Sequence, residues 1–266
     1  MNQSRANERE GPPTSRVLVV VPTYQEAANL PELVSRFFRV VPACAMLVVD
    51  DASPDGTAEL CERLMENQPN LYLLRRRGDR GLGRAYVAGI EYGLRHGYGI
   101  IGTMDADLSH DASYLPAMLD RAREYPVVVG SRYVRDGGTI NWQIRRILLS
   151  WLANKFAARL LKVPVRDGTS GFRLYRAEAL RTIRLDDVKS TGYSFLVELL
   201  YRLHRNGFGI AEVPIVFYDR TGGSSKLSRK EIFLGAVNIL RLKVSRKKDL
   251  PVEGSGLARR LSSDEK

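Results

Sequence analysis

The first half of the chain alternates short apolar runs with longer amphipathic segments. The apolar runs are rich in valine, isoleucine and leucine, which is typical of strands buried on both faces of a parallel sheet. They predict strands at residues 16–21, 45–49, 71–74, 99–104 and 127–130. The segments between them predict helices at residues 29–40, 57–67, 84–96 and 112–124. Asn29 is expected to cap the first of these helices, with Pro31 in its first turn. Repeated strand–helix units indicate an α/β fold, Rossmann-like and built on a mostly parallel central sheet.

The second half is less regular. Pro214 interrupts a strand-like run, which favours an edge strand. The segment before it, residues 167–175, is rich in turn-forming residues and is expected to be a loop or hairpin. The remaining elements are helices at residues 142–162, 194–206 and 228–243, a strand at residues 210–217 and a flexible loop at residues 219–228.

These patterns predict one domain at residues 16–245, with disordered tails at residues 1–15 and 246–266. The first tail is polar and lacks the apolar segment of a signal peptide. Cys44 and Cys61 follow no disulfide or metal-binding spacing, which is compatible with a reducing cytoplasm. No run reaches the roughly 18–20 apolar residues that span a bilayer. We therefore expect a protein that does not cross a membrane.

The net charge of +11 is concentrated in two segments. Residues 142–162 contain five basic and no acidic side chains, and residues 226–248 contain eight basic side chains and one acidic one. Localised positive charge favours a polyanionic partner, namely phosphates, nucleic acid or an anionic membrane surface.

Polar residues follow four of the predicted parallel strands, where ligands bind in such sheets. Asp105 and Asp107 are separated by one residue, and such a carboxylate pair can share Mg²⁺ or Mn²⁺, although surface Asp pairs are common. Asp50 and Asp51 form a second strand-end pair, and a carboxylate there can accept hydrogen bonds from a ribose or base. Tyr24 can stack on a base, and Glu26 can bind it. The alternative for the segment at residues 50–55 is a turn that caps the next helix.

Seven motifs occur in a characteristic order: VVPTYQEAANL, VVDDASPDGT, GLGRAY, DADLSHDASYLP, GSRY, DGTSGFRLYR and DR-x-x-G-x-S-K. In this the chain resembles the dolichol- and polyprenol-phosphate mannosyltransferases, a family of inverting GT-A glycosyltransferases. The resemblance covers residues 16–245 and implies a GT-A nucleotide-diphospho-sugar transferase fold. Gln25 stands where relatives have Asn, and Asp79 where they tend to be basic.

The resemblance also implies residue roles. Asp107 is expected to be the principal metal carboxylate, while Ser109 stands at a metal-side position where many relatives have Gln. The catalytic group comprises Asp107, Arg132, Arg220 and Lys226. The donor-binding residues are Pro22, Tyr24, Glu26, Val49, Asp51, Asp105, Ala106, Asp107, Arg132, Arg220 and Lys226; the metal-binding residues are Asp105, Asp107 and Ser109; and the acceptor-side residues are Arg146, Ser170 and Arg173.

The activity that the resemblance implies is transfer of mannose from GDP-mannose to dolichyl or polyprenyl phosphate, with Mg²⁺ or Mn²⁺ as cofactor and with inversion. A phosphate monoester is anionic at neutral pH, so the acceptor needs no general base. The alternatives are a relative that uses UDP-glucose or another nucleotide sugar, and a basic nucleic-acid-binding module. Nucleic acid is not expected as a partner, because the basic residues interleave with apolar helix faces rather than with stacking aromatics.

A lipid acceptor requires contact with a membrane. We expect peripheral binding to the anionic cytoplasmic face of a membrane through the basic amphipathic segments of the second half. For the helix at residues 228–243, Ile232, Phe233, Ile239 and Leu240 are expected to face lipid, and the alternative is that they pack on the sheet.

Overall fold

The computed structural model describes residues 16–78, 80–188, 193–219, 238–240 and 242–243. Arg220, Lys226, Ile232, Phe233 and both predicted tails lie outside the described residues.

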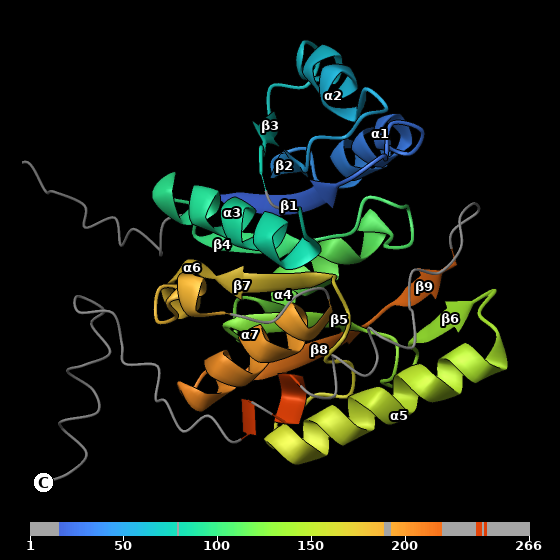
Figure 1. Cartoon of the computed structure of the whole chain (residues 1–266), viewed down its shortest axis with the longest axis vertical. Coiled ribbons are helices and arrows are strands. Elements are labelled where there is room, and N and C mark those ends of the chain that lie inside the picture. The colour runs from blue at the N-terminus through green and yellow to red at the C-terminus, as the bar shows by residue number, and fades with distance from the viewer. Residues whose placement is uncertain (1–15, 79, 189–192, 220–237, 241, 244–266) are drawn as a thin grey trace, which may run out of the picture.

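The predicted strand–helix units of the first half are confirmed (Figure 1). The last predicted helix is divided into a 3-10 turn and a short α-helix. The elements are β1 (Val17–Thr23), α1 (Leu30–Val40), β2 (Ala45–Asp50), α2 (Thr57–Met65), β3 (Leu71–Arg75), α3 (Leu82–Arg95), β4 (Ile100–Thr103), η1 (Ala112–Tyr114), α4 (Leu115–Arg121) and β5 (Val127–Ser131).

Asn29 precedes α1 as expected, but its side chain does not cap the helix. Its backbone is already helical, with φ −94° and ψ −27°, whereas a capping residue usually has an extended backbone that turns its side chain toward the first amides. The Asn29 amide instead donates to Glu26 Oε2 over 2.7 Å.

The second half adds a central strand, an edge strand and a two-stranded sheet. These elements are β6 (Gly138–Ile140), α5 (Ile144–Leu161), β7 (Arg173–Arg176), α6 (Ala177–Leu180), η2 (Leu185–Asp187), α7 (Tyr193–Arg205), β8 (Ile210–Pro214) and β9 (Val216–Tyr218). The strand predicted at residues 210–217 divides at Ile215 into β8, at the edge of the main sheet, and β9, which pairs with β6.

The main sheet has seven strands in the order β3-β2-β1-β4-β7-β5-β8. All its pairings are parallel except those of β7. The carboxyl ends of β1, β2, β4 and β5 therefore meet at one edge of the sheet, where the polar motifs of the first half lie. The predicted α/β fold with a mostly parallel sheet is confirmed.

The expectation of a loop or hairpin at residues 167–175 missed β7, which lies antiparallel between β4 and β5. Arg173 at its start has no exposed surface. Its guanidinium donates to the carbonyl oxygens of Gly168, Ser170 and Leu196 over 2.6–2.7 Å. These internal hydrogen bonds compensate for the cost of burying the charge. Because a charged residue begins the strand, the sequence does not show it as an apolar run.

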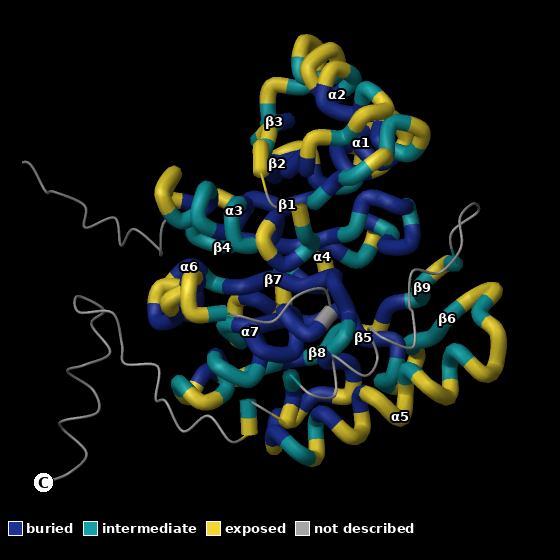
Figure 2. Tube along the Cα trace, viewed as in Figure 1, coloured by how far each residue is buried: buried dark blue, intermediate teal, exposed yellow. Residues whose placement is uncertain are grey.

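The sheet is buried on both faces (Figure 2). Leu18 and Val20 of β1 pack with α3, α7 and the end of α5, whereas Val19 and Val21 pack with α1, α2 and α4. Within the described residues, no helix is long and apolar enough to cross a membrane.

Candidate active site

The carboxyl edge of the sheet holds two neighbouring aspartates with different surroundings. Asp50 is buried and accepts hydrogen bonds from the Thr23 hydroxyl (3.1 Å) and from the amide and hydroxyl of Ser53 (3.0 and 2.6 Å). It therefore fixes the turn after β2. Asp51 pairs with Arg76 and accepts from the backbone amide of Gly81 over 2.9 Å.

The alternative that residues 50–55 form a turn at the start of the next helix applies to Asp55. Asp55 accepts from the amide of Thr57, the first residue of α2, and from the amide of Ala27, each over 3.1 Å. This aspartate thus joins the loops after β1 and β2. Asp51, rather than Asp50 or Asp55, is the carboxylate of the group placed toward the start of α3.

Tyr24 and Glu26 lie in the loop after β1, where they were expected. The Tyr24 hydroxyl accepts from Arg80 over 2.8 Å, and the Arg80 guanidinium lies 4.7 Å from the ring centroid. Base stacking on this face of Tyr24 would require Arg80 to move, and the donor contacts of Pro22, Tyr24 and Glu26 stay predictions.

The donor contacts predicted for Val49 and Ala106 stay predictions, and the side chains of both residues are buried. Val49 has no exposed surface, and Ala106 is only 4% exposed. Val49 belongs to the apolar core on one face of the sheet, and Ala106 to the core on the other face.

Asp105 is held by groups from three parts of the chain. Its Oδ1 accepts from the Tyr86 hydroxyl of α3 over 2.8 Å, and its amide donates to His110 Nδ1 over 3.1 Å. A Cβ at Gly171 would lie 3.0 Å from Asp105 Oδ1, so an alanine there would press on the carboxylate. The Asp105 side chain remains 20% exposed.

Asp107 is the second carboxylate of the pair. Its Oδ1 accepts from both the amide (3.1 Å) and the hydroxyl of Ser109, across a turn in which Leu108 has φ +62°. Ser109 is 1% exposed, so its evident contact is with Asp107. Ligation of a metal by Ser109 stays a prediction.

His110 is buried between the rings of Phe172 and Phe217, each 5.2 Å away between centroids. Burial lowers the pKa of His110 and outweighs the neighbouring carboxylates Asp105 and Asp107, which act in the opposite direction. The ring is therefore neutral at neutral pH. Because the Asp105 amide can only donate, Nδ1 carries the lone pair and Nε2 the proton.

The chemistry of the site fits a hard divalent cation. The described residues contain no group of three His, Cys, Asp or Glu side chains arranged around a metal position. Asp105 and Asp107 could hold such an ion through their two carboxylates, with phosphate and water oxygens as further ligands. Mg²⁺ is commonly bound in this way, through one or two carboxylates and the substrate phosphates.

Arg132, which follows β5, forms a buried ion pair with Asp167. Its Nε and Nη2 each donate to the Asp167 carboxylate over 2.7 Å, and its backbone amide adds a third bond of 3.0 Å. Burial alone would raise the pKa of Asp167, but the charge and hydrogen bonds of Arg132 bring the pKa below its ordinary value. Arg132 is 8% exposed, and its contact with the donor stays a prediction.

The segment after Asp167 is attached to α5 by Asn154. The Asn154 side chain accepts from the Thr169 amide (3.1 Å) and donates to the Thr169 hydroxyl (3.0 Å). Ser170 and Arg173 are 1% and 0% exposed. Both side chains form hydrogen bonds inside this segment, and their predicted contact with the acceptor stays a prediction.

Arg146 lies in the first turn of α5. It donates to Asp219 over 2.8 Å, and its guanidinium lies 3.9 Å from the centroid of a ring of Trp142. The amide of Tyr218 donates to the Ser109 carbonyl over 3.3 Å, which places the end of β9 beside the Asp105–Asp107 turn. The predicted acceptor-side residue Arg146 is therefore joined through Asp219 to the chain segment that contacts this turn, and its side chain is about one-third exposed.

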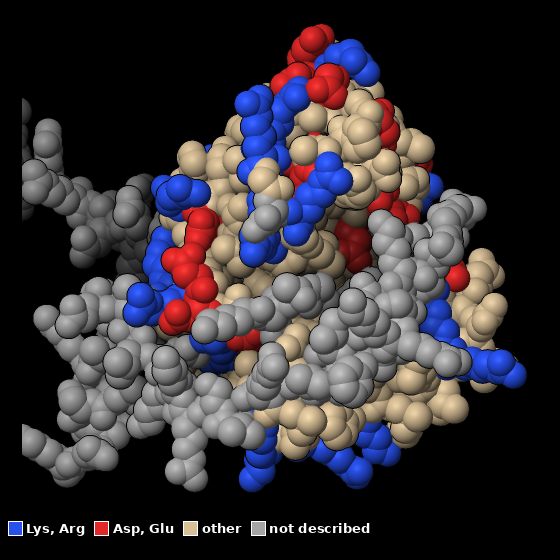
Figure 3. Space-filling model, viewed as in Figure 1, with Lys and Arg blue, Asp and Glu red and all other residues tan. Residues whose placement is uncertain are grey.

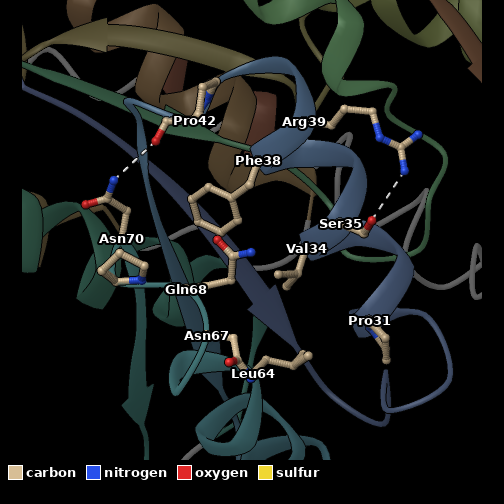
Figure 4. Close-up of a pocket in the computed structure, with 11 residues that line it drawn as sticks. Pro31, Val34, Ser35, Phe38, Arg39, Pro42, Leu64, Asn67, Gln68 and Asn70 are labelled. Atoms are coloured by element: carbon tan, nitrogen blue, oxygen red, sulfur yellow. Dashed lines mark hydrogen bonds between the residues drawn. The ribbon is translucent and has the colours of Figure 1, made fainter.

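A surface pocket between α1 and the segment at residues 64–70 lies elsewhere (Figure 4). Pro42 and Asn70, which line it, stand near the amino ends of β2 and β3, the opposite edge of the sheet. It does not contribute to the carboxylate site.

Sequence reasoning assigned no role to Tyr86, Asn154, Asp167 or Gly171. Tyr86 falls on the apolar face of α3, and Asp167 in a turn-rich segment. The only signal was that Tyr86, Asp167 and Gly171 stand inside the quoted motifs GLGRAY and DGTSGFRLYR.

The chain is similar to known glycosyltransferases. The family model described as glycosyl transferase family 2 matches residues 18–184. An undecaprenyl-phosphate mannosyltransferase of Micrococcus luteus is 41% identical over 226 residues, which cover 85% of this chain and 93% of that protein. A polyprenol monophosphomannose synthase of Mycolicibacterium smegmatis is 44% identical over 222 residues, with 83% and 84% covered.

Solved structures support the fold. Glucosyl-3-phosphoglycerate synthase from Mycobacterium tuberculosis, in complex with Mn²⁺, UDP and glucosyl-3-phosphoglycerate, has a TM-score of 0.63 at 16% identity and covers 91% of this chain and 82% of its own. Mannosyl-3-phosphoglycerate synthase from Rubrobacter xylanophilus has a TM-score of 0.64 at 18% identity, with 85% and 73% covered. The fold is the GT-A fold.

The Arg132–Asp167 pair gives a prediction about stability. Asp167→Asn should lower the free energy of unfolding by about 3–5 kcal/mol, because it leaves the Arg132 charge buried without a counter-ion. Urea unfolding at neutral pH measures this loss. Glu32→Gln, which breaks the half-exposed pair with Arg36, is the control and should cost under about 1 kcal/mol.

The same variant should alter the dependence on pH. Because the folded pKa of Asp167 is depressed, its contribution is present above the unfolded pKa of about 3.9 and is lost as the pH falls below it. Asp167→Asn should lack this part of the acid limb. If Asp167→Asn lowered the free energy of unfolding no more than Glu32→Gln does, the Arg132–Asp167 pair would not be a major contribution to stability.

Proposed function

Since the chain belongs to glycosyl transferase family 2 and to its polyprenol-phosphate mannosyltransferases, we propose that it transfers mannose from GDP-mannose to a polyprenyl or dolichyl phosphate. The products are GDP and a β-linked polyprenyl-phosphate mannose. The observation that carries the proposal is the carboxylate pair Asp105 and Asp107, which lies at the carboxyl edge of a GT-A sheet. The names of the two relatives support mannose and a lipid phosphate.

The donor lies along the carboxyl edge of the sheet in this proposal. Asp51, at the end of β2, accepts hydrogen bonds from the nucleoside, and the Asp105–Asp107 turn faces the diphosphate. A bound Mg²⁺ or Mn²⁺ would offset the negative charge that builds up on the departing GDP. Asp107 is the principal carboxylate for this ion, with Asp105 held beside it by Tyr86.

The acceptor phosphate is its own nucleophile. It is anionic at neutral pH, because its second pKa is about 6, and it attacks the anomeric carbon without giving up a proton. His110 supports a mechanism without a base, since it is buried and its Nδ1 is used by the Asp105 amide. In-line attack from the face opposite GDP inverts the α-linked sugar to the β-linked product, so alignment is the main task of the site.

Arg146 is the described cation best placed to receive the acceptor phosphate. Its side chain is about one-third exposed and is paired with Asp219, so an acceptor phosphate would compete with the Asp219 carboxylate for the guanidinium. Arg220 follows Asp219 directly in the chain, and with Lys226 it supplies further positive charge in this proposal. Arg132 fixes the segment that follows Asp167 through its ion pair with that residue. In this proposal its positive charge also acts on the phosphate groups of the substrates.

Helix α5 presents an unusual surface to solvent. Six large apolar side chains are between 40% and 83% exposed, and its charged residues are all basic. The apolar residues are Ile144, Leu148, Leu149, Trp151, Leu152 and Phe156. Only Asn154, Ala157 and Leu161 of this helix are buried. In Figure 3 the described atoms that are visible in the lower part of the molecule are mostly neutral, with basic side chains at the lower and right-hand edges.

We assign this face to a membrane surface. Exposed apolar patches on a water-facing helix are disfavoured unless they are covered, and basic residues at their rim attract anionic lipids. The position of Arg146 at one end of α5 would then place the acceptor phosphate at the boundary between lipid and site. Peripheral binding to the cytoplasmic face brings the enzyme to its lipid substrate.

The expectation for the later helix is partly wrong. Ile239 is 9% exposed and packs in the core with α3 and α7, so it does not face lipid. Leu240 is 48% exposed, and the Lys243 ammonium donates to the Leu160 carbonyl near the end of α5. Membrane contact thus falls mainly to α5 among the described elements.

Removal of the metal or of Asp107 should abolish transfer. With polyprenyl phosphate in vesicles and radiolabelled GDP-mannose, Asp107→Ala should lower turnover by roughly 100-fold or more, because charge on the leaving group goes uncompensated. Excess chelator should have the same effect, reversed by Mg²⁺ or Mn²⁺. Asp120→Ala, at a carboxylate that is 78% exposed on α4, is the control. Full activity in chelator would contradict metal dependence.

Donor identity is tested by competition. With GDP-mannose and UDP-glucose at equal concentrations and one polyprenyl phosphate acceptor, we expect mannosyl lipid to be the main product. Mass spectrometry of the lipid product identifies the sugar that was transferred, and the amounts of GDP and UDP released show how much of each donor was consumed. Preferential consumption of UDP-glucose would favour the alternative of a polyprenyl-phosphate glucosyltransferase.

The membrane assignment predicts a selective loss of vesicle binding. The variant Leu148→Ser/Leu152→Ser/Phe156→Ser should weaken binding to anionic vesicles at least about tenfold, because apolar area no longer enters the interface. Ala153→Ser, an exposed position of the same helix, is the control. Thermal stability and binding of GDP should be unchanged. Lower stability with normal vesicle binding would place α5 in an internal or protein interface instead.

A further inference from the structure

We propose that Tyr86 is a positioning residue for the metal–diphosphate site: its hydroxyl holds the Asp105 carboxylate in a preformed orientation. The inference rests on the proposed function, because it assigns a partner to one of the two carboxylates of that site. Tyr86 touches no reacting atom in this proposal and acts through Asp105.

Tyr86 connects the apolar core to the site. It has no exposed surface, and its ring stacks on Phe195 of α7 with a centroid distance of 6.1 Å and an angle of 9° between the rings. A phenol hydroxyl buried among apolar groups costs free energy unless it is paired. Asp105 Oδ1 accepts from it over 2.8 Å, and the carboxylate is itself 20% exposed toward the site.

Gly171 closes the opposite side of this contact. A Cβ at this position would lie 3.0 and 3.3 Å from the two carboxylate oxygens of Asp105 and 3.3 Å from the Tyr86 hydroxyl. The Gly171 carbonyl accepts from the Thr103 hydroxyl of β4 over 2.7 Å, so the backbone cannot easily withdraw. The absence of a side chain here is what lets the carboxylate and the hydroxyl meet.

The backbone of Asp105 is fixed as well. Its amide donates to the neutral ring of His110, which is wedged between Phe172 and Phe217. The main chain and the side chain of Asp105 are therefore held by α3, by the segment before β7 and by the turn after β4. A carboxylate fixed before the ligand arrives loses little conformational freedom on binding, and partners of metal ligands typically contribute about 10–100-fold to metal affinity or activity.

Two variants disturb the same carboxylate in different ways. Tyr86→Phe keeps the stacked ring and removes only the hydroxyl, whereas Gly171→Ala keeps the hydroxyl and presses on Asp105. Each has a matched control. Tyr98→Phe removes a buried hydroxyl near the amino end of β4, where it accepts from Arg16, and Gly138→Ala adds a methyl group that meets nothing within 4 Å.

The experiment measures Mn²⁺ binding by electron paramagnetic resonance in the presence of GDP, and separately the turnover and KM for GDP-mannose. Tyr86→Phe and Gly171→Ala should raise the dissociation constant for Mn²⁺ and lower kcat, each by about 10-fold or more. Added Mn²⁺ should restore part of the activity. Both controls should bind Mn²⁺ as the wild type does, and unfolding temperatures should differ little within each pair.

The outcomes separate this inference from the proposed function. Wild-type Mn²⁺ affinity and kcat in both Tyr86→Phe and Gly171→Ala would overturn the positioning role, as would a wild-type protein that binds no Mn²⁺ with GDP. If the wild type binds Mn²⁺ but transfers no mannose, the proposed function fails, and the effect of Tyr86→Phe on Mn²⁺ affinity still decides the role of Tyr86. Gly171→Ala decides the matter where Tyr86→Phe is unstable.

Discussion

The buried ion pair between Arg132 and Asp167 is the contact on which the geometry of the second half depends. Removing two charges from water is expensive, and the cost is offset only where good geometry and further hydrogen bonds accompany the pair. Here Arg132 gives Asp167 three hydrogen bonds, and the backbone amide of Asp167 donates to Glu212 of β8 over 3.0 Å. The segment between β5, β8 and α5 is thereby fixed, and with it the place of Gly171 beside Asp105.

The same segment explains how α5 can leave its apolar side chains exposed. Most helices of globular proteins are held by an apolar stripe facing the core. In α5 the inward residues are few, and one of them, Asn154, binds Thr169 through both ends of its amide. Directional hydrogen bonds thus replace part of the apolar packing that would otherwise orient the helix. The large apolar residues of α5 therefore remain exposed to solvent, on the helix that carries Arg146 in its first turn.

Much of the fold and the outline of the site followed from the sequence, but the detail did not. Strands buried on both faces produce apolar runs that periodicity detects, and their carboxyl ends locate Asp51, Asp105 and Asp107. β7 was not predicted, because its first residue is a buried arginine whose hydrogen-bond partners are backbone carbonyl groups outside the strand. A motif also does not tell which of its side chains are buried, and Ser170 and Arg173, which the resemblance placed on the acceptor side, have almost no exposed surface. Tyr86, in contrast, was given no role from the sequence. A tyrosine on the apolar face of a helix cannot be distinguished from a packing residue until the partner of its hydroxyl is known.

These contacts share one physical theme, which is that the site is shaped by fixed dipoles and charges rather than by groups that exchange protons. His110 has a pKa lowered by burial, and Asp167 has a pKa held below its ordinary value by Arg132, so neither changes protonation near neutral pH. Both serve to hold backbone, His110 at the Asp105 amide and Asp167 at the Arg132 amide. A nucleophile that is already anionic needs alignment and charge compensation more than it needs a base. A carboxylate pair at the edge of a sheet, with its backbone and side chains held by hydrogen bonds, is suited to that requirement.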